Sequence, residues 1–124
     1  MAVQLLKSGP LISLQDLGRF SGMNNGIPIS GVMDKNLFIA TNKILGHKKN
    51  LAALEIFMQP FEVKFTKNTF FSIGAYDADI FLNKTKIEAL KAYQAKEGDL
   101  LRIQKINKGV WSYFLVKNGF ITEE

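Results

Sequence analysis

The chain has 124 residues and a mass of 13.9 kDa, which is enough for one domain with an ordinary hydrophobic core. A net charge of +5, with 47% hydrophobic and 22% charged residues, is typical of a globular chain. The absence of Cys and the single His exclude disulfides, thiolate metal sites and any site that needs two imidazoles from one copy. No apolar run approaches the ~18 residues of a membrane span and no secretory signal is evident, so we expect a cytoplasmic protein with no membrane partner.

The sequence pI near 9.5 raises nucleic acid as a partner. However, fourteen of the sixteen basic residues are lysines scattered along the chain. Only Arg19 and Arg102 carry the guanidinium fork that reads bases or binds phosphates in two-point fashion. This distribution is typical of a solvated surface, and we expect no nucleic-acid partner.

The first distinctive segment in chain order is rich in glycine. Gly18, Gly22, Gly26 and Gly31 fall within 14 residues together with Pro28. Such a density excludes a regular helix or central strand and predicts an ordered loop. Long loops in small domains are commonly functional.

A helix is predicted directly after this loop, near residues 34–46. Asp34 is a suitable N-cap, and Gly46 stands where a left-handed residue ends a helix. An apolar stripe between them is formed by Leu37, Phe38, Ile44 and Leu45. We expect this stripe to pack on a sheet.

The rest of the chain predicts strands separated by turns. The expected strands are Ala53–Met58, Phe61–Thr66, Thr69–Gly74, Ala78–Leu82, Asp99–Lys105 and Val110–Lys117. In the last strand Trp111 and Tyr113 alternate with Ser112 and Phe114, so both faces carry substantial side chains. The segment Ile87–Ala95 suits either a helix or an extended edge. Residues 1–124 therefore form a single, mainly β domain, a small barrel or sandwich with one clear helix.

The glycine-rich loop also holds the strongest candidate for chemistry, because Asp16 and Arg19 lie at its start. A guanidinium flanked by glycines can approach a carboxylate or phosphate, and successive backbone N–H groups in such a turn can bind an anion. The alternative is that Asp16 and Arg19 form an ion pair that braces the loop. The sequence has no phosphate-binding GxxxxGK[ST] loop, no GxSxG elbow and no HExxH motif.

Four further residues are weaker candidates for a site. Glu55 lies in an apolar run and needs a partner, for which we expect a structural role with the backbone of the glycine-rich loop or Arg19. Asp77 and Asp79 share one face of a strand, but no third ligand is near them in sequence, so we expect no metal site. His47 is interpreted as an exposed histidine at a helix end rather than a catalytic base.

The glycine-rich region resembles the start of the KipA family, whose members are called the 5-oxoprolinase C subunit, the biotin-dependent carboxyltransferase subunit or allophanate hydrolase subunit 2. The resemblance rests on Gly9-Pro10, on Gln15-Asp16-Leu17-Gly18-Arg19 and on Gly26-Ile27-Pro28-Ile29-Ser30-Gly31-Val32-Met33-Asp34. Later segments match in register, among them Ala40–Gly46, Ala53-Leu54-Glu55, Ser72–Ala75, Gly98–Leu101 and Tyr113–Val116. Thr41, His47 and Asn118 depart from the family pattern. Family members continue into a second half, so the chain resembles their N-terminal domain.

The resemblance implies a cyclophilin-like β fold and a subunit that works with a KipI-like partner and with the missing C-terminal domain. It implies a small amide or lactam substrate, in ATP-dependent opening of 5-oxoproline or in carboxyl transfer from carboxybiotin to a urea-like acceptor. ATP or carboxybiotin then belongs to the full assembly, and we expect this domain to bind no cofactor itself and not to be catalytic alone.

The resulting hypothesis assigns roles within the glycine-rich region. Arg19 and the loop amides, including those of Gly18, Ser30 and Gly31, bind a carboxylate or carbonyl oxygen. Gln15 and Asn42 hydrogen-bond the substrate amide, and Asp16 or Asp34 accepts a proton, although Asp34 is equally explained as a helix cap. The alternative function is a non-enzymatic interaction module that binds and antagonises a KipI-like kinase inhibitor.

Overall fold

The described residues form two antiparallel sheets and one helix. The computed structural model describes residues 3–7, 12–15, 32–57 and 61–120. Sheet A contains, in spatial order, β1 (Val3–Lys7), β4 (Phe61–Phe65), β9 (Leu100–Lys108), β6 (Asp77–Leu82) and β7 (Thr85–Ile87). Sheet B contains β2 (Ile12–Gln15), β3 (Ala53–Phe57), β10 (Trp111–Val116), β5 (Thr69–Gly74) and β8 (Tyr93–Ala95). The mainly β prediction is confirmed, and the strands form two sheets that are not closed into a barrel.

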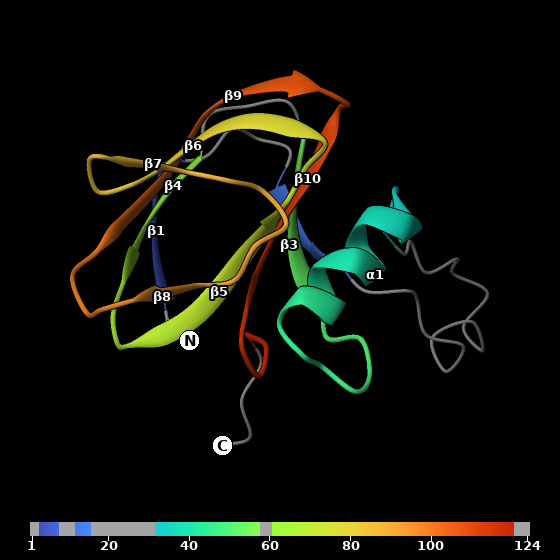
Figure 1. Ribbon diagram of the computed structural model, residues 1–124, viewed down its shortest axis with the longest axis horizontal. Helices are drawn as coiled ribbons and strands as arrows, with labels where there is room; N and C mark the ends of the chain where they lie inside the picture. Colours follow the sequence, from blue (N-terminus) through green and yellow to red (C-terminus); the bar gives the residue numbers. More distant parts are fainter. Residues whose placement is uncertain (1–2, 8–11, 16–31, 58–60, 121–124) are drawn as a thin grey trace.

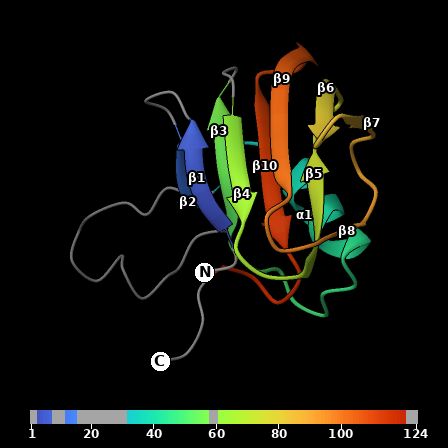
Figure 2. The ribbon, with the colours of Figure 1, turned by 90° about the vertical axis from the view of Figure 1, so that its left-hand side faces the viewer.

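The molecule is layered, with sheet A and α1 on opposite faces of sheet B (Figure 1). The strand axes of the two sheets are roughly aligned (Figure 2). Aromatic side chains fill the space between the sheets, with Phe61 and Phe65 from β4 close to Phe114 from β10, at ring-centroid distances of 5.7 and 6.0 Å. Phe71 from β5 lies 5.1 Å from Phe65. Burial of these rings is the main stabilising contribution to the core.

The helix α1 (Lys35–Ile44) lies where the sequence predicts it. Asp34 caps its N-terminus, and Gly46 adopts φ +76° just after its end, as the glycine signal indicates. Its buried face packs on β5 and β10, and Phe38 meets Tyr113 edge-on at 6.0 Å. Strand β10 is therefore covered on both faces, which explains its apolar character on both sides.

For the segment Ile87–Ala95 the sequence left a helix or an extended edge open, and the structure shows the extended edge. It contains no helix, and its ends are the short strands β7 and β8 at the edges of the two sheets. Leu90 adopts φ +59°, and its N–H donates to the carbonyl of Ile73 at 2.7 Å. Pairing with the two sheets overrides the helix-favouring composition of this segment.

Candidate functional site

The structure describes part of the predicted site. Five of its residues lie outside the described residues, namely Asp16, Gly18, Arg19, Ser30 and Gly31. Gln15 ends β2, where its backbone is paired with Ala53 of β3. Asp34 and Asn42 lie at opposite ends of α1 and do not come together. The described part of the site is therefore the start of α1 and the strands beneath it.

Besides the backbone hydrogen bond from the Phe38 N–H to its carbonyl, Asp34 is held by three hydrogen bonds. Its Oδ1 accepts the N–H of Leu37 at 3.1 Å, which caps the helix, and its Oδ2 accepts the hydroxyl of Tyr76 at 2.6 Å. Its own N–H donates to the Tyr113 hydroxyl oxygen at 2.9 Å. The helix-cap explanation of Asp34 is thus confirmed, and the same carboxylate also orients the exposed ring of Tyr76.

Glu55 has the partners that a buried carboxylate needs. Only 4% of its surface is exposed, and its Oε2 accepts the Tyr113 hydroxyl at 2.6 Å and the Met33 N–H at 2.7 Å. The strand register places Tyr113 directly opposite Glu55. The structural role is confirmed, with Met33, two residues beyond Gly31, as the backbone partner. Burial and the neighbouring Glu55 carboxylate raise the pKa of Tyr113 well above its ordinary value, so its hydroxyl stays a donor.

Together these bonds form one network, the Glu55–Tyr113 network, that fixes the backbone at Met33 and Asp34. It links β3 and β10 to the start of α1 and, through Tyr76, to the turn between β5 and β6. The link from Tyr113 to Asp34 runs through a backbone N–H, which does not carry protons along a chain. The network therefore positions the end of the glycine-rich segment and does not connect Glu55 to the surface as a proton path.

Asn42 has a role that differs from the predicted substrate contact. It is fully buried, its Nδ2 donates to the carbonyls of Phe38 and Leu51, and its Oδ1 accepts the Leu51 N–H at 2.9 Å and a hydrogen bond from His47 Nδ1 at 2.7 Å. Since these partners use the whole hydrogen-bonding capacity of the amide, none is left for a substrate. Asn42 braces the end of α1 against the chain that follows.

His47 is half-buried rather than exposed, and it joins two parts of the chain. Its Nε2 accepts the N–H of Asn118 at 3.0 Å, so Nδ1 carries the proton that is donated to Asn42. Burial, with a smaller contribution from the nearby Lys117 ammonium, lowers the pKa of His47. The ring is therefore a neutral structural bridge in the folded chain.

Tyr76 was not singled out by the sequence, although with Met33 it is one of the two large exposed side chains of this region. It is 58% exposed, and its ring lies over Gly109, where an added Cβ atom would come within 2.9 Å of Cδ2. It also lines a cavity of about 310 Å³ between the β5–β6 turn and residues 86–90. A tyrosine in a short turn between two strands is the only sequence signal that marks it.

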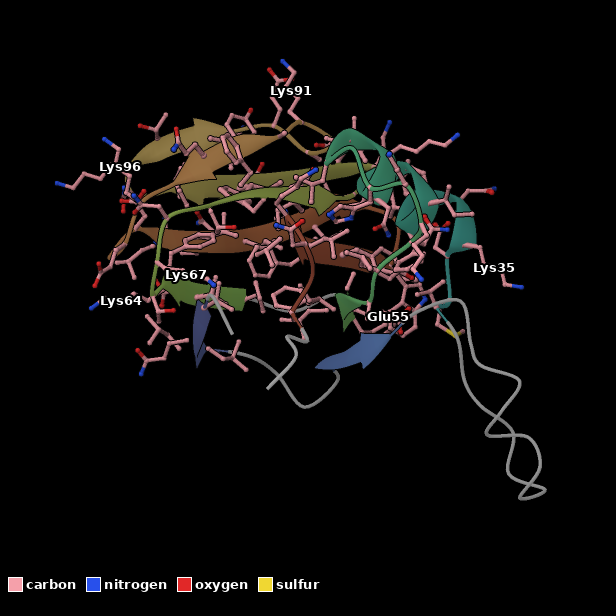
Figure 3. The ribbon with its side chains drawn as sticks, turned by 90° about the horizontal axis from the view of Figure 1, so that it is seen from below. Lys35, Glu55, Lys64, Lys67, Lys91 and Lys96 are labelled. Carbon is pink, nitrogen blue, oxygen red and sulfur yellow. The ribbon has the colours of Figure 1, made fainter. Side chains whose placement is uncertain are left out.

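The remaining charged residues are dispersed. Asp79 contacts Lys86 at 3.6 Å and Asn107 at 3.1 Å, and among the residues the structure describes no three His, Asp or Glu side chains converge as metal ligands. Lys64, Lys67 and Lys96 lie at one end of the molecule and Lys35 at the other, beyond Glu55 (Figure 3). Within the described ranges, no helix is long and apolar enough to cross a membrane.

Comparison with known proteins places this arrangement among carboxyltransferase domains. The family model "carboxyltransferase domain, subdomain A and B" matches residues 25–124. The 5-oxoprolinase C subunit of Haemophilus influenzae is 29% identical over 109 residues, covering 88% of this chain and 35% of the relative. The urea amidolyase of Lachancea kluyveri is 30% identical over 124 residues, covering 99% of this chain and 7% of the relative.

A solved structure has the same fold. The crystal structure of the K. lactis urea amidolyase superposes with a TM-score of 0.89 at 28% identity, over 99% of this chain and 8% of that one. The chain thus spans about a third of the bacterial subunit and less than a tenth of the yeast enzymes.

Proposed function

Because this chain belongs to the carboxyltransferase-domain family of subdomains A and B, we propose that it is the N-terminal part of a KipA-like subunit that acts on an amide or lactam. The reaction is either ATP-dependent opening of 5-oxoproline or carboxyl transfer from carboxybiotin to a urea-like acceptor. The observation that carries this proposal is the family match across residues 25–124, supported by relatives named as the 5-oxoprolinase C subunit and urea amidolyase.

The glycine-rich region carries the reacting group in this proposal. Arg19 binds a carboxylate or carbonyl oxygen, with the amides of Gly18, Ser30 and Gly31 beside it, Gln15 binds the substrate amide and Asp16 accepts a proton. A guanidinium is suited to this task because it binds a planar carboxylate through two parallel hydrogen bonds. The Glu55–Tyr113 network supports the assignment, since it fixes the backbone immediately after this region.

The site is completed by other parts of a larger assembly. The relatives are much longer than this chain, which supports a C-terminal domain, and the name of the 5-oxoprolinase C subunit supports partner subunits, one of which we propose is KipI-like. ATP or carboxybiotin is bound by those parts, and this domain alone is not catalytic. We place the assembly in the cytoplasm.

The test is an Arg19→Ala variant in the reconstituted assembly, assayed with 5-oxoproline plus ATP and with urea-like acceptors. We expect activity to fall by at least about a hundredfold, because the substrate loses a charge-assisted, two-point contact worth about 3 kcal/mol. The melting temperature should stay unchanged. Arg102→Ala is the matched control, since Arg102 lies over the Phe81 ring at 5.1 Å on sheet A.

Two results would contradict the proposal. A variant that is unfolded shows that Arg19 braces the loop, and an assembly with full activity shows that Arg19 does not bind substrate. An assembly that turns over neither substrate, but in which the chain binds a KipI-like subunit, would favour the alternative function of an interaction module.

A further inference from the structure

The turn after β10 leaves one side-chain amide free. The Asn118 N–H donates to His47 Nε2 at 3.0 Å, and the Gly119 N–H donates to the carbonyl of Val116 at 2.9 Å. Asn118 and Gly119 both have a left-handed backbone, with φ +70° and +82°. Asn118 is exposed, and its side-chain amide has no hydrogen-bond partner within the described part of the chain. The backbone of this turn is therefore fixed, whereas the amide group is free to rotate toward the next residue.

The glycine at the next position distinguishes Asn118 from the other described asparagines, each of which precedes a residue with a side chain. Because glycine has no Cβ, its nitrogen can approach the preceding side chain without steric hindrance. Asn83 is the natural comparison, since it is also exposed and left-handed, at φ +56°. However, its Nδ2 donates to Asp99 at 3.1 Å, its Oδ1 accepts the Leu100 N–H at 3.0 Å, and Lys84 follows it. The amide of Asn83 is therefore held in place beside a hindered nitrogen, and that of Asn118 is not.

We propose that Asn118 is a modification site, at which the chain deamidates spontaneously through a succinimide. The amide nitrogen of Gly119 loses its proton and forms a bond to Asn118 Cγ, and the Cγ–Nδ2 bond breaks as ammonia leaves with that proton. Water then opens one of the two C–N bonds of the imide. The products are aspartate, or isoaspartate in which the main chain runs through Cγ. Water is the only other reactant, and the net charge of the chain becomes one unit more negative.

The turn itself sets the rate of this reaction. The Gly119 N–H is held by the Val116 carbonyl, so this hydrogen bond must open before the nitrogen can attack. The loss of one backbone hydrogen bond corresponds to about a tenfold change in an equilibrium constant. The folded chain should therefore deamidate at Asn118 about tenfold more slowly than the unfolded chain, and still faster than at Asn83.

The product carboxylate acts on His47, which joins the end of α1 to this turn. The neutral ring accepts the residue 118 N–H at Nε2 and donates to Asn42, an uncharged partner on α1. Lys117, which directly follows β10, is the charged neighbour that opposes a proton on the ring. A carboxylate at residue 118 favours the imidazolium and so raises the pKa of His47. Because a protonated ring has no lone pair to accept the N–H, the modification weakens the bridge between α1 and β10.

The experiment is incubation of the purified chain at mildly alkaline pH, folded and in urea, followed by peptide mass spectrometry. An endoprotease that cuts after lysine at mildly acidic pH releases residues 118–124 as one peptide and residues 68–84, with Asn83, as another. We expect the first peptide to convert to its aspartate and isoaspartate forms and the second to stay unchanged in the folded chain. The pair Asn25-Gly26 lies outside the described residues and is read separately, in peptide 8–35. Asn118→Gly is the matched control, because it keeps the left-handed backbone and has no amide to lose.

Asn118→Asp tests the consequence directly, because it carries the product charge without the wait. His47 is the only histidine of the chain, so its ring-proton NMR signals follow its titration without ambiguity. We expect the titration midpoint to rise in Asn118→Asp and to stay in place in Asn118→Gly. Peptide 118–124 that remains unmodified in the folded chain while it converts in urea would overturn the proposed site, as would equal conversion at Asn83. An unchanged midpoint in Asn118→Asp would overturn the effect on His47.

Discussion

Tyr113→Phe probes the Glu55–Tyr113 network with the smallest possible change. The substitution removes one oxygen and keeps the ring that packs against Phe38 at 6.0 Å. The Asp34 N–H then loses its acceptor, and the buried Glu55 carboxylate loses the donor that lies 2.6 Å away. The loss at the Asp34 N–H costs about 1 kcal/mol and the loss at the carboxylate about 2–3 kcal/mol, which gives about 3–4 kcal/mol for the variant. For a chain of this size that corresponds to a fall of about 10 °C in melting temperature.

Thermal and urea unfolding of the purified chain measure this effect, with Tyr93→Phe as the control. Tyr93 also accepts a backbone N–H at 2.9 Å, but in an exposed turn, so its variant should change stability by about 0.5 kcal/mol or less. Hydrogen exchange of the Met33 and Asp34 amides should accelerate in Tyr113→Phe only. If the two variants were equally stable, the buried network would contribute nothing beyond an exposed hydrogen bond, and our explanation of Glu55 would be refuted.

Two further predictions concern the chain that follows α1 and the packing of α1 on β5. The pKa of His47 lies below its ordinary value of 6.5 in the folded chain, so the unfolded chain binds more protons in this window. Its contribution to stability is therefore complete above pH 6.5 and is lost as the pH falls from there toward the folded pKa, and His47→Gln should flatten the melting temperature across this range. Gly74→Ala should destabilise the chain by about 3 kcal/mol or more, because its Cβ would lie 1.9 Å from Thr41 Oγ1, and Thr41→Ala in the same chain should restore part of the loss. A Gly74→Ala variant as stable as the unsubstituted chain would show that the extra methyl group is tolerated, and equal stability of the single and double variants would show that Thr41 is not the source of the clash.

Local signals in the sequence predict most of the fold. The helix was predicted correctly because Asp34 and Gly46 mark its ends, and the strands because turn residues separate them. The edge strands β1 and β2 were not predicted, since each is short and its pairing with β4 or β3 comes from distant parts of the chain. The same reason explains Ile87–Ala95, whose two ends pair with different sheets.

The candidate site was harder to predict than the fold. The sequence shows that Glu55 needs a partner, but not that Tyr113, 58 positions away, supplies it. Asn42 lies in a segment that matches the family, and the sequence does not show that its side-chain amide is hydrogen-bonded to His47 and Leu51, which follow the helix. The hydroxyl of Tyr76 is held by the carboxylate of Asp34, which lies 42 positions earlier in the chain. Each of these contacts is set by strand register and helix docking, which a local pattern does not encode.

The register of β10 links the place where α1 packs on sheet B, at Gly74, to the backbone that follows the glycine-rich segment. Tyr113 pairs with Glu55 on one side and with Gly74 on the other, so one row across sheet B holds the carboxylate, the hydroxyl and the glycine. Gly74 lets Thr41 of α1 approach the sheet, and this brings the start of the helix to Tyr113. A shift of β10 by one residue would turn Tyr113 toward sheet A and leave Glu55 and the Asp34 N–H without their partner. The position of Asp34, and through it that of Tyr76, therefore depends on the core of sheet B, so substitutions in that row should shift both residues.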